Sequence, residues 1–245
     1  MAWLRIVAAI AGLVVVVLVL RLLPPLVVLV LVIWGTTWLV RRVRADQASD
    51  RRVGAELLGL RRETSDPFGI AGYPLQLFAR SDDGVVEDVA WGPWRGLEVR
   101  AFGASVRAPA VPGIVAAVPP TTSIAAALTN IAAEAPPIVL EPEIFATRFE
   151  RQPSMARVTT GDRAFDAAWT VRCDDAAFAG ALLDDAMRRW LLDIGDMWGF
   201  ELSARIALVF AVASDRPDVV SVLDLLAGFL RRVPDGLLVT RPPAV

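Results

Sequence analysis

The side chains available for chemistry are mainly carboxylates, because this chain of 245 residues contains no histidine and no lysine. A Walker-type phosphate loop and a protein-kinase site each need a lysine, and Ser-His-Asp, Cys-His and Schiff-base mechanisms need a base that is missing here. Zinc sites built on histidine or on paired cysteines are excluded as well, since Cys173 is the single cysteine. Carboxylate chemistry, or a metal site made only of oxygen ligands, is what remains.

Two sets of acidic residues are candidates for that chemistry. Asp162 and Asp166 would form a carboxylate pair for general acid and base catalysis. A second set offers oxygen ligands for a hard cation, but it lacks the spacing of a calcium loop: Asp82, Asp83, Glu87 and Asp88. We interpret the second set as solvated turn residues, and we expect Asp162 to stabilise a turn and Asp166 to point outward. The sequence therefore predicts no catalytic residue, no cofactor and no metal ligand.

Cys173 and the tryptophans of the distal chain are interpreted as core residues. Cys173 has the same parity as Trp169 and Val171 in an expected strand, and no base is present to activate its thiol. Most of the tryptophans lie on apolar faces, where packing is a commoner role than lining a ligand pocket or an interaction patch: Trp91, Trp94, Trp169, Trp190 and Trp198.

The first forty residues predict a membrane hairpin, which must position everything that follows. Residues 6–20 contain no polar side chain, and residues 26–40 form a second apolar run that includes two tryptophans. One helix over residues 3–40 would be about 57 Å long, nearly twice the hydrocarbon core of about 30 Å. Because Pro24-Pro25 breaks the helix, we expect two transmembrane spans, at about residues 3–22 and 25–41.

Two other interpretations of this segment are open. A wedge-like hairpin would enter the bilayer without crossing it, since both arms are short for a full span. A cleaved signal peptide is disfavoured, because no small-residue cleavage site follows Leu20 and a second apolar arm does follow. A transmembrane hairpin over residues 1–42 is the prediction that we carry forward.

Arginines set the expected topology. A group that we name the basic neck follows the second span at once: Arg41, Arg42, Arg44, Arg51 and Arg52. By the positive-inside rule the turn, with Arg21, lies outside, and the distal chain lies in the cytoplasm at the inner membrane. Residues 43–63 are expected to form a basic juxtamembrane helix, whose arginines also suit contact with anionic lipid headgroups.

Residues 64–245 are predicted to form one cytoplasmic domain. The whole chain is therefore expected to be α+β, with a transmembrane helical hairpin followed by a soluble domain of antiparallel sheet and packed helices. Turn residues separate strand-like runs at residues 74–80, 84–94, 96–102, 138–140 and 198–213. Helices are expected at residues 122–134, which are rich in alanine, at a turn after residue 143, and at residues 174–192 and 217–232.

A strand followed by a helix is expected to form the centre of the core. Alternate residues from Phe165 to Cys173 would share one face of the strand, and the helix would carry apolar residues at helical spacing. The residues assigned to this core strand-helix element are Phe165, Trp169, Phe178, Leu182 and Trp190. Asp184 with Arg188, and Asp185 with Arg189, would pair at i,i+4 on the solvent side.

Charge is distributed unevenly along the chain. Residues 1–62 contain nine arginines against three acids, and residues 63–245 contain sixteen arginines against twenty-four acids. The distal domain is therefore acidic, which excludes nucleic acid as an expected partner because a polyanion needs a basic face. The partners expected instead are the lipid bilayer and an unidentified protein.

Three motifs carry a resemblance to known proteins. They are GD..FD..W.V..DD from residue 161, WG.W.G..V..F at residues 91–102, and LEPE at residues 140–143. Over residues 68–235 the chain resembles a group of uncharacterised actinobacterial membrane-anchored proteins, and it is more distantly similar to a broader bacterial family of unknown function that shares the FD..F.V..D strand-helix element. Members usually have Phe where this chain has Trp169. The resemblance implies a shared architecture and no particular activity.

Two functional hypotheses follow. The first is a non-enzymatic interaction or regulatory module held at the cytoplasmic face of the inner membrane. The alternative is a carboxylate-dependent hydrolase that acts near the membrane. A solvent-exposed cleft with two carboxyls of raised pKa would favour the hydrolase, whereas an apolar core with acids only at the surface would favour the module.

Overall fold

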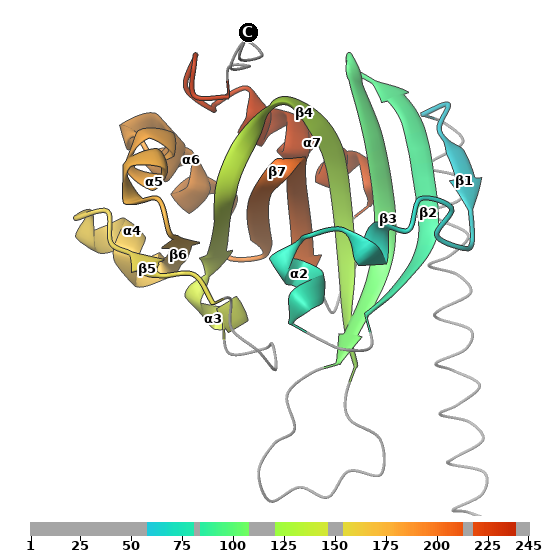
Figure 1. Ribbon diagram of the computed structural model, residues 1–245, viewed down its shortest axis with the longest axis horizontal. Helices are drawn as coiled ribbons and strands as arrows, with labels where there is room; N and C mark the ends of the chain where they lie inside the picture. The colour runs from blue at the N-terminus through green and yellow to red at the C-terminus, as the bar shows by residue number, and fades with distance from the viewer. Residues whose placement is uncertain (1–57, 81–83, 108–120, 147–153, 213–217, 239–245) are drawn as a thin grey trace, which may run out of the picture. The chain divides into compact units, whose positions relative to one another are not determined.

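The computed structural model describes residues 58–80, 84–107, 121–146, 154–212 and 218–238 (Figure 1). The chain divides into two compact units, Met1–Arg51 and Arg52–Val245, and every described residue belongs to the second. The expected hairpin and the basic neck lie outside the described residues. Within those residues, no helix is both long enough and apolar enough to span a bilayer.

A seven-stranded sheet organises the described unit, and all of its pairings are antiparallel. The strand order is β1-β2-β3-β4-β6-β5, and β7 also pairs with β4. The strands are β1 Arg61–Glu63, β2 Val85–Trp94, β3 Leu97–Arg107, β4 Thr121–Pro142, β5 Arg157–Val158, β6 Trp169–Cys173 and β7 Trp198–Val212. The helices are η1 Ile70–Gly72, α2 Gln76–Ala79, α3 Glu143–Ala146, α4 Arg163–Ala168, α5 Ala176–Leu182, α6 Asp185–Ile194 and α7 Val219–Leu230. The described unit is thus α+β with an antiparallel sheet.

The β2–β3 hairpin follows directly from its turn sequence. Trp94 pairs with Leu97, so the loop has two residues, Arg95 and Gly96. Both have positive φ, 47° and 82°, which is the geometry that matches the twist of a tight hairpin. The Arg95 guanidinium lies 4.4 Å from the centre of the Trp94 ring and pairs with Asp224 of α7 at 2.6 Å. The hairpin is therefore tied to the helix that covers it.

The alanine-rich segment expected to be a helix at residues 122–134 is instead the first half of β4. Its backbone pairs with β3 on one side and with β7 on the other. Successive alanines enter opposite cores, because Ala125 and Ala127 pack in one and Ala126 in the other. Intrinsic helix propensity amounts to a few tenths of a kcal/mol per residue, so pairing on both edges and burial on both faces override it.

Four other expectations about the secondary structure of single segments were wrong. The run at residues 74–80 forms α2 rather than a strand, and Arg61–Glu63, expected to end a helix, forms the edge strand β1. Asp162 caps α4 by accepting hydrogen bonds from Ala164 N and Phe165 N, so the strand begins only at Trp169. The single helix expected at residues 174–192 is two helices, α5 and α6, because Asp184 caps a new helix at Met187 N.

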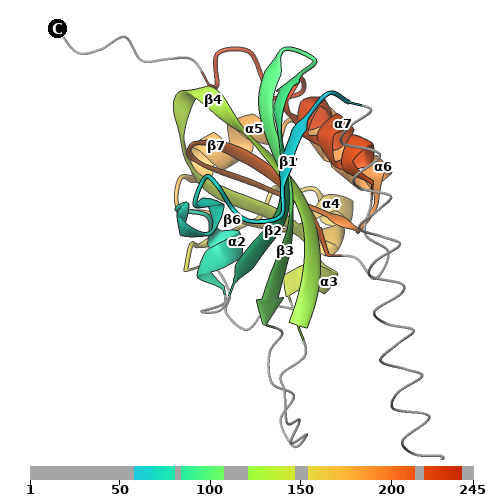
Figure 2. The same ribbon diagram turned by 90° about the vertical axis from the view of Figure 1, so that its right-hand side faces the viewer.

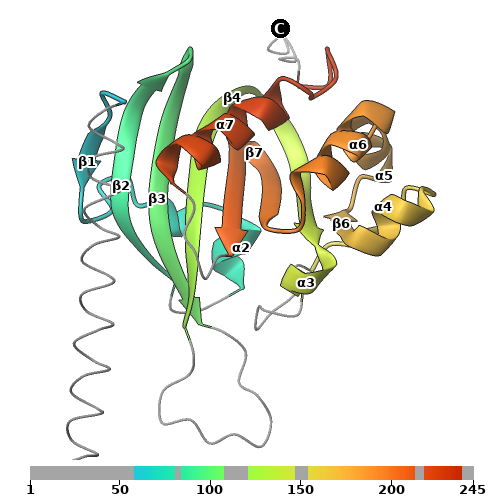
Figure 3. The ribbon, with the colours of Figure 1, turned by 180° about the vertical axis from the view of Figure 1, so that it is seen from behind.

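Each face of the sheet is covered by its own set of helices. The first core, named the helical core, lies under α4, α5, α6 and α7, as the rear view shows (Figure 3). The second, named the strap core, lies under η1, α2 and α3, on the face turned to the viewer in Figure 1. The β4–β7 register shifts between Asn130 and Ile138, and Ala204 has φ 51°, so both strands bend there. Figure 2 shows the curvature from the side.

Gly199 in β7 has no room for a side chain. A Cβ at this position would overlap the ring of Phe210, which is fully buried in the strap core. We expect Gly199→Ala to destabilise the fold by about 1–3 kcal/mol, the usual cost of overpacking a dense core. Urea unfolding of the full chain in mild detergent measures this. Gly180→Ala is the control, because a Cβ there meets nothing within 4 Å, and an equal cost for both variants would contradict the overlap.

Candidate functional site

Three charged side chains meet inside the domain, beneath α2. Arg80 follows the last residue of α2, Glu141 lies near the end of β4, and Glu201 lies near the start of β7. Their exposed fractions are 2%, 0% and 1%. Ionisable groups are rarely buried so completely, so we name these residues the buried charge cluster and treat it as the candidate site.

Strand parity explains why both carboxyls reach this place. Leu140 and Phe200 are register partners, and both pack into the helical core. Residues one position away point to the opposite face, so Glu141 and Glu201 both lie on the side that α2 covers. Arg80 reaches the same spot because it is the residue that directly follows α2.

Direct polar contacts attach the α2 segment to the sheet. Arg80 Nη1 donates to Glu141 Oε2 at 2.7 Å. Glu201 accepts two backbone hydrogen bonds, from Gln76 N to Oε1 at 2.5 Å and from Leu77 N to Oε2 at 3.1 Å. In this cluster the Oε1 atom of Glu141 is buried and accepts no hydrogen bond from any described residue. The helix start is thus capped by a carboxyl from a strand more than a hundred residues away in sequence.

Burial raises the pKa of Glu201 from 4.5 to about 7. The amides of Gln76 and Leu77 and the charge of Arg80 act in the opposite direction, and the carboxyl of Glu141 adds to the rise. Chemically, this arrangement can hold a proton near neutral pH. It cannot present that proton to a substrate in the observed conformation, because α2 covers both carboxyls.

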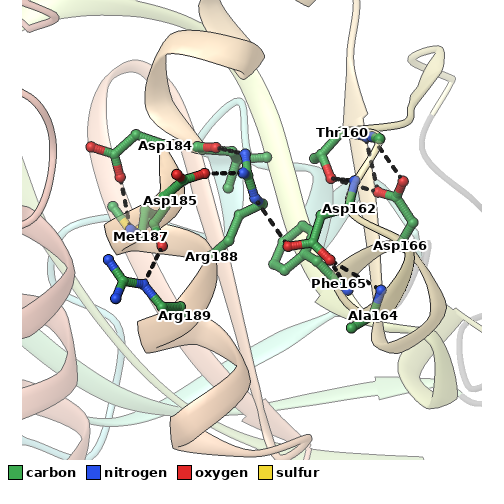
Figure 4. A network of polar contacts seen from close by, with 12 residues as sticks. Thr160, Asp162, Ala164, Phe165, Asp166, Asp184, Asp185, Met187, Arg188 and Arg189 are labelled. Carbon is green, nitrogen blue, oxygen red and sulfur yellow. Dashed lines mark hydrogen bonds and ion pairs between the residues drawn. The ribbon is translucent and has the colours of Figure 1, made fainter.

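Asp162 and Asp166, the candidate carboxylate pair, make contacts that stabilise a helix start and a turn (Figure 4). Asp162 caps α4, and its Oδ2 lies 3.5 Å from Nε of Arg188 on α6. Asp166 lies near the surface and accepts hydrogen bonds from Thr160 N, Thr160 Oγ1 and Gly161 N. The bond from the Thr160 amide is the main cause of a lowered pKa for Asp166. A carboxyl held ionised in this way is a poor general acid.

The expected i,i+4 ion pairs on α6 are replaced by other contacts. Arg188 pairs with Asp185, three residues before it, and with Asp162 of the neighbouring α4. Arg189 Nε donates to the backbone oxygen of Asp185 at 3.1 Å. Asp184 is committed to capping α6, so its carboxyl serves the helix start. The Asp162–Arg188 contact thus joins α4 to α6.

Asp166→Asn is expected to destabilise the fold by about 1–2 kcal/mol at pH 7, because hydrogen bonds to an ionised acceptor are the stronger kind. The folded-state pKa of Asp166 is depressed, so its contribution is present above the ordinary value near 3.8 and is lost as pH falls below it. Urea unfolding of both chains at pH 7 and pH 3 measures the difference. A gap that stays constant between the two pH values would contradict this account.

Of the acids considered as cation ligands, only Glu87 and Asp88 lie within the described residues. Asp82 and Asp83 lie outside the described residues. Asp88 occupies a bulge in β2 with φ 58° and pairs with Arg62 of β1 at 2.8 Å. Across the described ranges, no group of three potential metal ligands occurs.

Cys173 and most of the tryptophans lie in the interior. Cys173 is 1% exposed, its Sγ donates to the backbone oxygen of Asp175 at 3.2 Å, and burial raises the pKa of its thiol. Raised thiol pKa and lack of access both oppose nucleophilic chemistry. Trp94, Trp169 and Trp198 are buried, whereas Trp91 and Trp190 are half-buried.

The residues of the core strand-helix element converge, although on more elements than the sequence suggested. Phe165 on α4, Trp169 on β6, and Phe178 and Leu182 on α5 are buried in the helical core. Trp190 on α6 packs at its edge. Two of them, Trp169 and Trp190, lie against Phe200 of β7, whose ring centre is 6.3 Å from the first and 5.5 Å from the second.

Sequence reasoning missed the buried charge cluster. Each member is a single charge in an otherwise apolar run: Arg80 in PLQLFAR, Glu141 in IVLEP and Glu201 in WGFELS. An isolated charge within a strand that is apolar on both sides is a signal that could have identified Glu141 and Glu201. No local pattern indicates that the three side chains meet, because the contact depends on the β4–β7 pairing.

No family model and no curated protein matches this chain. A solved structure does match: the crystal structure of the mycobacterial trehalose monomycolate transport factor A, TtfA. The likeness is one of fold. The TM-score is 0.55 at 14% sequence identity, and the match covers 80% of this chain and 97% of TtfA. It supports the α+β architecture over nearly the full length of TtfA.

Proposed function

We propose that this chain is a membrane-anchored, non-enzymatic interaction module that serves the movement of a lipid. Its N-terminal hairpin would hold the domain at the cytoplasmic face of the inner membrane, with the basic neck against anionic headgroups. The observation that carries the non-enzymatic part is the burial of Glu141 and Glu201, at 0% and 1% exposure beneath α2. The remaining carboxyls considered for catalysis, Asp162 and Asp166, are occupied in capping and turn contacts.

Support for the lipid part comes from the likeness in fold. TtfA is a trehalose monomycolate transport factor, and trehalose monomycolate is a glycolipid. The apolar runs at residues 6–20 and 26–40 suit entry into a bilayer, so the sequence and the likeness in fold both favour a role at the membrane. A module that contacts a lipid transporter, or the lipid itself, fits these features.

A second candidate is the carboxylate-dependent hydrolase, and one observation favours it. Glu201 has a pKa of about 7 and is influenced by the charge of Glu141, as in sites where two carboxyls have separate roles. We rank it second because a hydrolase needs substrate and water at those oxygens. In the observed conformation the Glu201 oxygens accept the Gln76 and Leu77 amides.

Complementation in the native host tests the proposal. A deletion strain is supplied with the full chain, with residues 43–245 alone, or with one of three carboxyl variants, Glu201→Gln, Asp162→Asn and Asp166→Asn. The readout is the distribution of lipids across the cell envelope, measured by mass spectrometry. We expect every carboxyl variant present at normal abundance to restore the distribution, and residues 43–245 alone to fail.

The outcomes separate the two candidates. Loss of rescue by a carboxyl variant at normal abundance would favour the hydrolase. An unchanged lipid distribution in the deletion strain would contradict the role in lipid movement. Rescue by residues 43–245 would show that the anchor is dispensable.

The orientation of the domain is tested separately. A fluorescent reporter fused after Val245 should be bright, and alkaline phosphatase fused there should be inactive, because the arginine distribution places the C-terminal side in the cytoplasm. The reverse pattern would contradict the proposed topology.

A further inference from the structure

We propose that residues 73–80 form a proton-sensitive strap, which is closed on the sheet while Glu201 holds a proton and loosens when Glu201 is ionised. The strap runs across β4 and β7 and contains α2 (Figure 1). This inference does not depend on the proposed function, because it concerns how the fold responds to pH.

Polar and apolar contacts attach the strap to the sheet. Four polar contacts hold it at three places: Pro74 O accepts from Ser203 Oγ at 2.9 Å, the amides of Gln76 and Leu77 donate to Glu201, and Arg80 pairs with Glu141. Two of the three places involve an ionisable carboxyl on the sheet. The apolar contacts of the strap, through Leu75, Leu77 and Phe78, do not change with pH.

The charge beneath the strap changes when Glu201 gains or loses a proton. Arg80 from α2 and Glu141 from β4 are the charged groups that act on Glu201, and its strand neighbour Ser203 does not titrate. With both carboxyls ionised, two negative charges face one positive charge in a place that water does not reach. One bound proton on Glu201 removes one of the two negative charges, and an uncharged carboxyl is far cheaper to bury.

Linkage gives the direction of the effect. With the strap closed, the pKa of Glu201 is about 7, and exposure to water would return it towards 4.5. The closed form therefore binds the proton more tightly, so protonation favours closure and rising pH favours opening. The opening equilibrium constant should increase up to about tenfold per pH unit between those two values, and it should level off above the higher one.

The composition of the chain makes this effect measurable. There is no histidine, so no side chain with an ordinary pKa changes its charge between about pH 5.5 and 8. Tyr73, at the start of the strap, is the only tyrosine of the chain. It is hydrogen bonded to η1 through Ile70 O at 3.0 Å, and its ring is half-buried against the strap core. Isotope-labelled tyrosine therefore reports on the strap alone.

The experiment uses the full chain in detergent micelles between pH 5 and 8. Hydrogen exchange of the strap amides is followed by mass spectrometry and corrected for the intrinsic pH dependence of exchange, and the ring signals of Tyr73 are followed by NMR. We expect protection of the strap to fall by up to about tenfold per pH unit below pH 7 and then to level off. The Tyr73 signals should shift over the same range, while protection of β3 amides stays constant.

Two variants complete the test. Glu201→Gln is neutral at every pH, so its strap should stay protected and its Tyr73 signals should not shift. Glu98→Gln, at an exposed carboxyl on β3, is the matched control and should behave like the unmodified chain. Strap protection that is independent of pH in the unmodified chain would overturn the proposal. So would a pH response that survives in Glu201→Gln. If that variant does not fold, the comparison of strap with β3 amides in the unmodified chain decides the matter.

Discussion

Arg80→Met should destabilise the domain by about 3–5 kcal/mol, the range measured when one partner of a buried ion pair is removed. The variant would leave Glu141 and Glu201 buried without the guanidinium that lies 2.7 Å from the Glu141 carboxyl. Methionine keeps the length and much of the volume of arginine, so the loss would report charge more than packing. Urea unfolding of the full chain in mild detergent, followed by circular dichroism, measures it.

Two comparisons make this expectation specific. Arg157→Met breaks a pair with Glu143 whose side chains are 48% and 50% exposed, and it should cost less than about 1 kcal/mol because exposed pairs contribute little. Combining Arg80→Met with Glu141→Leu should recover part of the lost stability, since apolar replacement of a whole buried pair is often neutral. If Arg80→Met lowered the free energy of unfolding as little as Arg157→Met, the ion pair of the buried charge cluster would not contribute to stability.

Phe200→Ala is the second large effect that we expect, at about 3–5 kcal/mol. Its ring is fully buried and lies 4.8 Å from Phe229 on α7, 5.5 Å from Trp190 on α6 and 6.3 Å from Trp169 on β6. Removing it opens a cavity between the sheet and two helices. The same unfolding experiment measures the loss.

Trp190→Ala is the natural comparison, because the sequence places Trp190 in the core element. Its side chain is half-buried and also lies beneath the Arg232 guanidinium, 4.8 Å from the ring centre. We expect a smaller loss of stability than for Phe200→Ala, since a half-buried side chain contributes less buried apolar surface to the fold. A larger loss of stability for Trp190→Ala would contradict this expectation and indicate that α6, not β7, supplies the central residue of the helical core.

The elements that could be predicted from sequence are those whose signals are local. The β2–β3 hairpin has a two-residue turn with glycine between alternating runs, and α7 has Asp218 as a cap before an apolar stripe. The first half of β4 could not be predicted, because alanine favours a helix until strands from distant parts of the chain pair with both edges.

The candidate site was less accessible to sequence reasoning than the fold. Acids in turns, such as Asp162 and Asp166, are easy to recognise in a sequence. Glu141 and Glu201 matter through their burial, which depends on where the strap crosses the sheet. Burial of a charge is a tertiary property, so no spacing rule within one segment indicates it.

The long central strand also affects how the chain is made. Ile124 near the start of β4 pairs with Val212, and Leu140 near its end pairs with Phe200. Ribosomes add about 5–20 residues per second, so β4 leaves the exit tunnel seconds before its partner strand has been synthesised. During that interval one edge of an apolar strand has no backbone partner, which is the condition that invites wrong pairing or chaperone binding. The sheet can therefore close only after β7 has left the ribosome.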